Sequence, residues 1–344
     1  MEIIRDKLIL IIGGTGSIGE TLVSTLLENS FPKQIRIYSR DETKQFFLKK
    51  KLDKYRDKLR FFIGDIRDKE RLNRAMQDVD IVFHLAALKH VVACEYNPFE
   101  AIKTNVLGIQ NLIEVCIENN IEKVIFTSTD KAATPCNTMG VTKLLGEKLM
   151  TAANFYKGSS KTVFYSVRFG NVLGSRGSII PLVEDQIKNE HPITLTHKDM
   201  TRYIMSIDKA SNLIIETLEI AQGGEVFILK MDSIKIVDLL DVLINHFTKK
   251  YNKSSEKIQI KEIGLFSGEK MYEELFSIEE SYRTFEIEDI FIIFPQITEL
   301  FENIDLSKYK DIKKFDIKKA FNSKDAQFLS KEEILDFLTD SNVI

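Results

Sequence analysis

The stretch at residues 128–143, S-T-D-K-A-A-T-P-C-N-T-M-G-V-T-K, gathers side chains that can move protons. It holds an adjacent acid and base, Asp130 and Lys131, and a second lysine, Lys143. It follows an apolar run at 124–126 and precedes a helical pattern at 144–156. A polar cluster between a buried strand and a helix is typical of the reactive edge of an open α/β sheet. We therefore predict an active site here; the alternative is a surface ion pair after a strand.

The N-terminal segment predicts a dinucleotide-binding loop. Residues 7–12 form an apolar run typical of a buried parallel strand, and a helical pattern covers 20–28. The glycines between them satisfy G-x-G-x-x-G and also G-x-x-G-x-x-G. Glycine permits the tight turn and lets a pyrophosphate approach the N-terminus of the helix. The cofactor contacts predicted in this loop are Gly13, Thr15, Gly16, Ser17, Ile18 and Gly19.

The residues after the second predicted strand, 35–38, indicate which dinucleotide binds. At this point an NAD site usually carries a carboxylate, whereas an arginine accommodates the 2′-phosphate of NADP. The sequence has Ser39 and Arg40, followed by Lys44, so we predict NADP. A solvated surface charge is the alternative for Arg40. We interpret Asp41 as the N-cap of the next helix.

Two further strand ends complete the predicted cofactor site. After a strand at 59–63, Asp65 is either an adenine contact or a loop cap. A strand at 79–85 ends in small residues, which let a flat cofactor lie close, and its His84 is interpreted as a packed histidine. A long helical pattern opens at Asn97-Pro98, and Asn105 within it is expected to reach back to the strand ends. The predicted contacts here are Asp65, Ile66, Ala86, Ala87, Lys89 and Asn105.

Strands at 123–127 and 162–169 bring the alternation of strands and helices to six. This pattern predicts an α/β fold with a doubly wound parallel sheet of the Rossmann type and a smaller α+β substrate lobe. We assign residues 1–169 plus 203–230 to the NADP-binding domain, and 170–202 plus 231–344 to the lobe. In the later part we predict helices at 181–188, 207–221 (N-cap Ser206 or Asp208), 236–247, 271–276 and 331–338.

Composition excludes several classes of protein. The chain has 344 residues, 44% of them hydrophobic, and its net charge of −3 gives no reason to expect a nucleic-acid partner. Three cysteines and five histidines at scattered positions predict no metal site and a reducing compartment. No apolar run reaches membrane length. We therefore expect a cytoplasmic protein without a membrane partner.

With these motifs in hand, nearly the whole chain resembles the extended short-chain dehydrogenase/reductases. More narrowly, it is similar to UDP-N-acetylglucosamine 4,6-dehydratases of pseudaminic acid and capsule pathways. The matching segments are G-G-T-G-S-I-G, Y-S-R-D-E, G-D-I-R-D, A-A-L-K-H, T-N-V-L-G, S-T-D-K-A, G-N-V-L-G-S-R-G-S, M-T-R and S-G-E-K. The combination of A-A-L-K-H, S-T-D-K-A and S-R-G-S separates this group from ordinary nucleotide-sugar epimerases.

The resemblance implies an internal redox cycle on UDP-N-acetylglucosamine. Hydride leaves C4 for NADP⁺, water is eliminated across C5 and C6, and the hydride returns to C6. By resemblance Lys131 is the C5 base and Asp130 the acid at C6. A lysine is a base near neutral pH only if its pKa is lowered, and the nicotinamide and Lys143 would supply the positive charge. The expected substrate contacts are Lys89, Ser128, Thr129, Asn171, Arg176, Ser178, Thr194, Arg202 and Glu269.

Two positions depart from the family pattern. Met139 stands four residues before Lys143, where most members have the tyrosine of Y-x-x-x-K, and a thioether cannot exchange a proton. We therefore expect Asp130 to take the C4 hydroxyl proton, Thr129 to orient that hydroxyl, Lys143 to hold the nicotinamide ribose, and Met139 to be a spacer. Phe266 stands where the family has an arginine for the diphosphate, which Arg202 or Arg176 would replace.

Several functions stay open at this point. The leading prediction is a 4,6-dehydratase with inversion at C5, acting as a homo-oligomer, either a hexamer or a dimer. A dehydratase that stops at the 5,6-ene, or a 4-epimerase, is the alternative among enzymes. The missing tyrosine also allows a non-catalytic NADP-binding regulator, although such a protein has little use for the Asp130-Lys131 pair.

Overall fold

A parallel sheet forms the centre of the computed structural model, which describes residues 2–316 and 320–344. Its parallel strands lie in the order β3-β2-β1-β4-β5-β6-β10. This is the Rossmann order, in which the strands are added on one side from β1 to β3 and on the other side from β4 onward, so that the strand order reverses between β1 and β4. The strands are β1 (Leu8–Ile12), β2 (Gln34–Ser39), β3 (Leu59–Ile63), β4 (Ile81–His84), β5 (Lys123–Thr129), β6 (Val163–Phe169) and β10 (Val226–Leu229).

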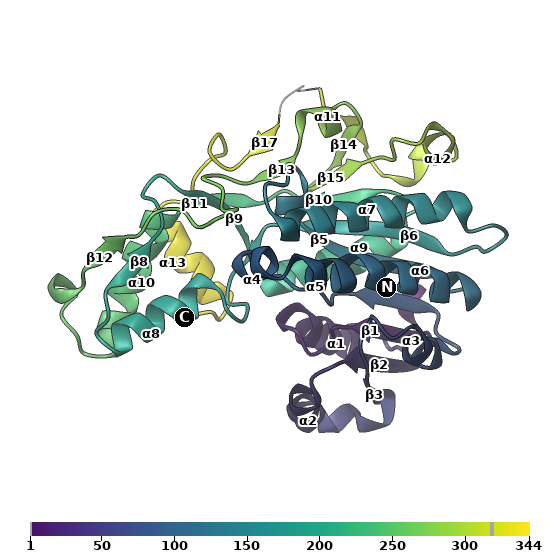
Figure 1. The fold of residues 1–344 in the computed structure, drawn as a ribbon, viewed down its shortest axis with the longest axis horizontal. Helices are drawn as coiled ribbons and strands as arrows, with labels where there is room; N and C mark the ends of the chain where they lie inside the picture. Colours follow the sequence, from purple (N-terminus) through teal and green to yellow (C-terminus); the bar gives the residue numbers. More distant parts are fainter. Residues whose placement is uncertain (1, 317–319) are drawn as a thin grey trace.

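Helices cover both faces of this sheet (Figure 1). One face packs against α1 (Ser17–Asn29), α2 (Glu42–Lys51) and α9 (Ile207–Ile220). The other packs against α3 (Lys69–Met76), α6 (Gly108–Glu118) and α7 (Thr138–Tyr156). The central strand β1 is buried on both faces, so its sequence, L-I-L-I-I, is a continuous apolar run rather than an alternating one. The doubly wound α/β fold predicted from the sequence is confirmed.

A second lobe lies beside the sheet, on the left in Figure 1. Its core is formed by α8 (Ile179–Lys188), α10 (Ile236–Lys250) and α13 (Lys331–Asp340). The predicted capping box at Ser330 and Glu333 begins α13. Two small sheets join the lobe: β7 (Asn171–Val172), β9 (Thr201–Met205) and β11 (Asp232–Lys235) form one, and β8 (Ile193–Leu195) with β12 (Ile260–Glu262) the other.

The C-terminal segment also extends the main sheet. β15 (Ile290–Ile293) pairs antiparallel with β10, and β14 (Thr284–Ile287) and β16 (Lys313–Lys314) follow. The range 231–344, which was assigned wholly to the lobe from the sequence, therefore contributes both to the main sheet and to the lobe. The other elements of this part are β13 (Glu274–Phe276), β17 (Phe321–Asn322), α11 (Ile278–Ser281), α12 (Thr298–Glu302), η5 (Ser255–Lys257) and η6 (Leu306–Lys308).

Three local differences from the sequence prediction affect the site. The helix predicted at 271–276 is wrong: β13 is a strand, because Leu275 and Phe276 are fully buried in an aromatic cluster. Helix α7 begins at Thr138 rather than 144, since Asn137 caps it by accepting from the Gly140 N–H at 2.7 Å. The helix predicted from Asn97-Pro98 is present but contains a π-turn.

The remaining elements are short. They are α4 (Val91–Tyr96), α5 (Pro98–Ile102), the π-helix η3 (Lys103–Leu107), η1 (Glu2–Ile4), η2 (Asp53–Lys58) and η4 (Asp130–Ala132). A helix with the length and apolar character needed to cross a bilayer does not occur in the parts of the chain that the structure describes.

Candidate active site

The glycine-rich loop lies at the reversal point of the sheet, between the ends of β1 and β4. Gly13 has φ +84°, and a Cβ on it would lie 2.7 Å from the Ala86 nitrogen. A Cβ on Gly19 would lie 2.6 Å from the Gly13 carbonyl oxygen. Gly16 is the N-cap of α1. These close contacts need glycine, and they leave the α1 N-terminus open for a phosphate group. The loop therefore fits a dinucleotide pyrophosphate.

The predicted 2′-phosphate residues lie together at the end of β2. Arg40 is exposed and its guanidinium lies 3.5 Å from the Asp65 carboxylate. The Ser39 hydroxyl accepts from the Gln45 amide at 3.1 Å. Asp41 caps α2, as predicted, by accepting from the Lys44 N–H at 2.9 Å. Asp65 accepts from the Arg67 N–H at 3.0 Å, which is the contact of a loop cap, and its adenine contact stays a prediction.

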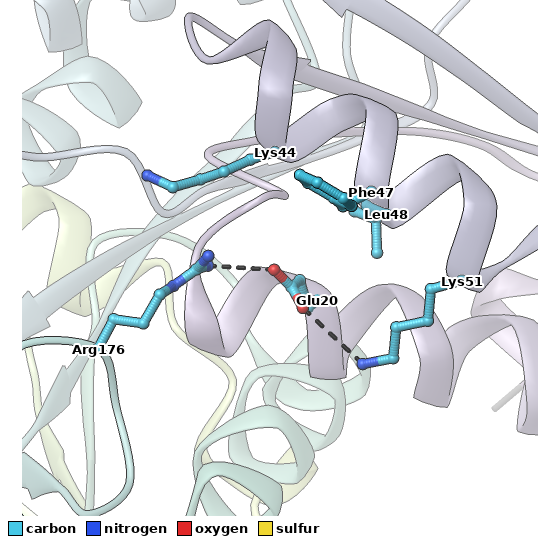
Figure 2. A pocket seen from close by; sticks show the side chains of 6 residues that line it. All are labelled: Glu20, Lys44, Phe47, Leu48, Lys51 and Arg176. Atoms are coloured by element: carbon cyan, nitrogen blue, oxygen red, sulfur yellow. Dashed lines mark hydrogen bonds and ion pairs between the residues drawn. The ribbon is translucent and has the colours of Figure 1, made fainter. Parts of the chain in front are cut away.

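A cavity of about 150 Å³ lies between α1 and α2, beside these residues (Figure 2). Its polar lining is three cations and one carboxylate: Lys44, Lys51, Arg176 and Glu20. Figure 2 shows the Glu20 carboxylate between Arg176 and Lys51, at 3.1 and 3.8 Å. The excess of positive charge suits an anionic group next to Arg40 and Lys44.

Arg176 lies against the dinucleotide loop rather than among the catalytic side chains. Its guanidinium donates to the Thr15 carbonyl oxygen, and its backbone N–H donates to the Ser17 hydroxyl at 3.1 Å. Lys89 donates to the Arg176 carbonyl oxygen at 2.6 Å. The sequence assigned Arg176 to the substrate, but the structure places it at the cofactor loop. The reason is the Gly174–Ser178 turn, which carries the arginine back across the strand ends.

Asn105 acts on the cofactor site through the backbone after β4. Its side chain accepts from the Leu88 N–H at 2.9 Å, and donates to the Leu88 carbonyl oxygen and to the Thr142 hydroxyl. Asn105 is 1% exposed and lies in the π-helix η3, whose extra residue per turn directs it inward. The prediction that it reaches the strand ends is confirmed. It fixes the segment of Ala86, Ala87 and Lys89 against α7.

The predicted acid and base meet at the end of β5. The Thr129 hydroxyl donates to Asp130 Oδ1 at 2.9 Å, and Lys131 Nζ donates to the same oxygen at 3.1 Å. Asp130 is fully buried, and its Oδ2 has no partner among the described residues. The Asn171 amide oxygen lies 3.5 Å from Lys131 Nζ. The surface ion pair considered as the alternative is therefore wrong, because the Asp130 side chain is 1% exposed and that of Lys131 only 20%.

Glu273 completes this cluster and was missed in the sequence. Its Oε1 lies 3.0 Å from Lys131 Nζ, and the residue is 1% exposed. Arg202 lies 3.6 Å from Glu273 and 3.5 Å from Glu269. A carboxylate from the segment before β13 and an arginine from β9 thus lie beside Lys131. No sequence motif marks Glu273, since it stands in M-Y-E-E-L beside a second glutamate.

The two lysines have opposite electrostatic environments. Burial lowers the pKa of Lys131, but the Asp130 and Glu273 carboxylates outweigh burial, and the net shift of its pKa is upward. This differs from the expectation that Lys143 would lower the pKa of Lys131. Burial lowers the pKa of Lys143 itself to about 7. Lys143 donates to the Thr127 carbonyl oxygen at 2.6 Å and lies 4.3 Å from the centre of the Phe126 ring.

Met139 packs away from the polar cluster. It is 5% exposed and lies in an apolar group with Cys94 and Ala101. Because α7 begins at Thr138, Met139 and Lys143 share one face in its first two turns. His84 stacks on Phe126 at 5.7 Å, and burial lowers its pKa to about 3, so it is a packed neutral histidine, as predicted.

The other predicted substrate residues lie in different parts of the structure. Ser128 is buried on β5, and its hydroxyl has no partner within residues 2–316 and 320–344. Ser178 is the N-cap residue of α8. Thr194 lies on β8 and accepts from Gln186 at 3.1 Å. Phe266 is exposed, and its N–H donates to Glu269 at 3.2 Å.

Comparisons with known proteins identify the relatives of the chain. The model of a family described as "Polysaccharide biosynthesis protein" matches residues 9–295. A Methanocaldococcus jannaschii protein named "Uncharacterized membrane protein MJ1061" is 53% identical over 98% of this chain and 96% of its own length. A Campylobacter jejuni "UDP-N-acetylglucosamine 4,6-dehydratase (inverting)" is 42% identical over 97% of this chain and 98% of its length.

Two more matches bear on the alternatives. A Rickettsia canadensis protein named "UDP-glucose 4-epimerase" is 38% identical over 98% of this chain and 97% of its own length. The crystal structure of Pen from Bacillus thuringiensis is 45% identical, covers 99% of both chains and superposes with a TM-score of 0.92.

Proposed function

Because the chain belongs to the family of polysaccharide biosynthesis proteins, we propose that it is a UDP-N-acetylglucosamine 4,6-dehydratase. The observation that carries the proposal is the hydrogen-bonded cluster of Thr129, Lys131 and the buried Asp130 at the end of β5, the strand beside β4. Such a cluster offers an acid and a base on one side of a sugar ring. The likeness to the Campylobacter dehydratase supports the substrate and the inversion at C5.

We propose NADP as the resident cofactor. The Gly13–Gly19 loop would hold the pyrophosphate, and Arg40 and Lys44 would hold the 2′-phosphate beside an electropositive cavity. Lys143 would hold the nicotinamide ribose. When bound, the cofactor supplies the acceptor for the C4 hydride and the donor of the hydride at C6. Since each hydride is returned within one cycle, the cofactor is a catalyst rather than a co-substrate.

The chain's own residues move the protons. In the proposal Asp130, oriented by Thr129, takes the proton of the C4 hydroxyl, and the C4 ketone then acidifies the C5 proton. Protonation of Asp130 removes one of the two carboxylate charges that raise the pKa of Lys131, so Lys131 can then remove the C5 proton. Asp130, now protonated, donates to the departing C6 hydroxyl, and Lys131 later returns a proton to C5. The Asp130 carboxyl group thus receives the proton of the C4 hydroxyl and later gives a proton to the C6 hydroxyl, which leaves as water. Its free Oδ2 is the atom available for both contacts.

We also infer a homo-oligomer. Large apolar side chains are exposed together on neighbouring helices α4, α5 and α7 and on η3. They are Val92, Tyr96, Phe99, Leu107, Val141 and Leu145. Apolar surface of this kind commonly marks a protein interface.

The product decides between the proposed reactions. Purified protein is incubated with UDP-N-acetylglucosamine in D₂O and the product is examined by NMR. A C6 methyl group beside a C4 ketone, with deuterium at an inverted C5, is the expected result. A product with an intact C6 hydroxyl would establish the 4-epimerase that the Rickettsia relative suggests. A C5=C6 double bond would establish the ene-forming dehydratase, and absence of turnover would leave an NADP-binding regulator.

The roles of the acid and the base are tested separately. Asp130→Asn should lower the rate of C4 oxidation by about 10²-fold or more, because general acid–base catalysis contributes about 10²–10⁴. Cofactor reduction in a single turnover measures that rate. Lys131→Met should stop deuterium incorporation at C5 while C4 oxidation continues. C4 oxidation at the wild-type rate in Asp130→Asn would show that another group takes the hydroxyl proton.

A further inference from the structure

Lys131 is held by two carboxylates that come from distant parts of the chain. Asp130 directly precedes Lys131 in η4, whereas Glu273 directly precedes β13 in the C-terminal half of the chain. The two distances to Nζ, 3.1 and 3.0 Å, are equal within the spread of ordinary charge-assisted hydrogen bonds. Glu273 is therefore as close a partner of the proposed base as Asp130.

The position of Glu273 is itself fixed by a buried network. Its N–H donates to the Ser323 hydroxyl at 3.1 Å, and the Ser323 N–H donates to its carbonyl oxygen at 2.9 Å. The next two residues of the chain after Glu274, Leu275 and Phe276, are fully buried. A carboxylate on such a rigid support stays in place when Lys131 changes its charge. Glu273 Oε2 has no hydrogen-bond partner in the described parts of the chain.

We propose that Glu273 is a positioning residue for Lys131, holding its amine at the substrate and setting the pH at which the amine loses its proton. This inference rests on the proposed function, in which Lys131 is the C5 base. Other charged groups facing Lys131 are Asp130 and Arg202, and Arg202 also pairs with Glu269. Burial chiefly, and then the charge of Asp130, raises the pKa of Tyr203 on β9. Glu273 differs from Asp130 because its proposed part involves no contact with the sugar.

The sign of the effect follows from the charges. A carboxylate beside an ammonium group favours the protonated amine, and an opposite charge at this distance shifts a pKa by about 1–3 units. Burial raises the pKa of Glu273 itself, although Lys131 and Arg202 oppose this rise. Replacement of Glu273 by an uncharged residue should therefore let Lys131 lose its proton at lower pH. The rising limb of kcat against pH should then move to lower pH, while KM for the sugar nucleotide stays the same.

The test compares Glu273→Gln with Glu273→Asp and Glu274→Gln in the cofactor-loaded protein. Glu274 is the matched control, because it is the neighbouring glutamate and pairs with Lys270 rather than Lys131. Competitive acetylation by acetic anhydride, read by peptide mass spectrometry, gives the pH at which Lys131 becomes reactive. In Glu273→Gln this pH should fall by about one unit, and in Glu274→Gln it should stay. Glu273→Asp should restore the wild-type value.

The two readouts separate this inference from the proposed function. Acetylation does not depend on the substrate, so a shifted labelling profile without turnover of UDP-N-acetylglucosamine would support Glu273 and reject the substrate assignment. The role of Glu273 would be overturned if the wild type and the three variants all turned over the substrate normally, with the same pH profile of Lys131 labelling and the same rising limb of kcat against pH. A uniform loss of kcat in Glu273→Gln without a shift on the pH axis would also overturn it, since that is the result of structural damage alone.

Discussion

Met139 keeps the position in the fold of the usual tyrosine but cannot carry out its proton transfer. It occupies the first turn of α7, one helical turn before Lys143, and is buried against Cys94 and Ala101. The proton transfer of the usual tyrosine has no counterpart in a thioether. In the proposed mechanism the acid–base work falls on the Thr129–Asp130–Lys131 cluster, in which Thr129 and Lys131 both donate to Asp130 Oδ1.

Substitution of Met139 tests this division of labour. Met139→Leu conserves the volume, so we expect kcat close to the wild-type value and a stability loss below about 1.5 kcal/mol. Met139→Tyr adds a ring to a packed site, and should cost about 1–3 kcal/mol without raising kcat. Steady-state kinetics and denaturant unfolding measure both. A large loss of kcat in Met139→Leu, in a stable protein, would give the thioether a chemical role.

At the scale of elements, the Gly174–Ser178 turn is tied to two strand ends at once. Arg176 bonds to the loop after β1 through Thr15 and Ser17, and Lys89 after β4 bonds to the Arg176 carbonyl oxygen. The turn therefore connects the segments after β1 and β4, between which the strand order reverses; in folds of this type a dinucleotide binds at that point. An enzyme that regenerates its cofactor in every cycle gains from such a bridge, because it has no need to exchange the cofactor.

Arg176→Ala should therefore speed NADP dissociation. The loss of one charge-assisted contact, about 1.5 kcal/mol, corresponds to a rate increase of about tenfold. Stopped-flow displacement of NADPH, followed by its fluorescence, measures the rate. Lys54→Ala is the control, because Lys54 also pairs with a glutamate of α1, Glu28, at 3.8 Å, but does not belong to the lining of the cavity. An unchanged dissociation rate with a raised KM for UDP-N-acetylglucosamine would return Arg176 to the substrate-binding role first predicted.

The parts of the site that depend only on residues close together in the chain could be predicted from the sequence. The strand, glycine loop and helix at the N-terminus, and the Asp41 cap, are local signals and are confirmed. Glu273 was not predictable, because 142 positions separate it from Lys131 and its place depends on the burial of Leu275 and Phe276. The same packing turned a predicted helix into β13. The contacts of Arg176 with Thr15 and Ser17 were not predictable, because a Gly-rich turn carries no periodic pattern that fixes its direction, and its substrate contact stays a prediction.

At the scale of the whole molecule, a fully buried arginine joins three segments. Arg168 on β6 donates to Glu147 of α7 at 2.7 and 3.0 Å, and to Glu280 of α11 at 3.0 Å. It also donates to the Leu275 carbonyl oxygen at 2.7 Å, which lies in β13, two residues after Glu273. The network thus fixes the C-terminal segment, and with it Glu273, to the strand next to β5.

Removal of this arginine should destabilise the fold. Arg168→Met leaves two buried carboxylates without their cation, and breaking a buried pair costs about 3–5 kcal/mol. Lys7→Met is the control: its ion pairs with Asp80 and Glu122 are partly exposed, so at most about 1 kcal/mol should be lost. Denaturant unfolding at neutral pH measures both. Equal losses in the two variants would show that Arg168 contributes no more than a surface charge.

The same network gives the pH dependence of stability. Burial raises the pKa of Glu280, but Arg168 outweighs burial, and the net pKa of Glu280 lies below its ordinary value. A carboxyl group with a lowered pKa stabilises the folded state above its unfolded pKa of about 4.3, and this contribution is lost as the pH falls. The wild type should therefore lose stability relative to Arg168→Met as the pH falls below this value. Parallel unfolding curves for the two proteins between neutral and acidic pH would contradict the network, because they would mean that Arg168 does not hold the charge of Glu280.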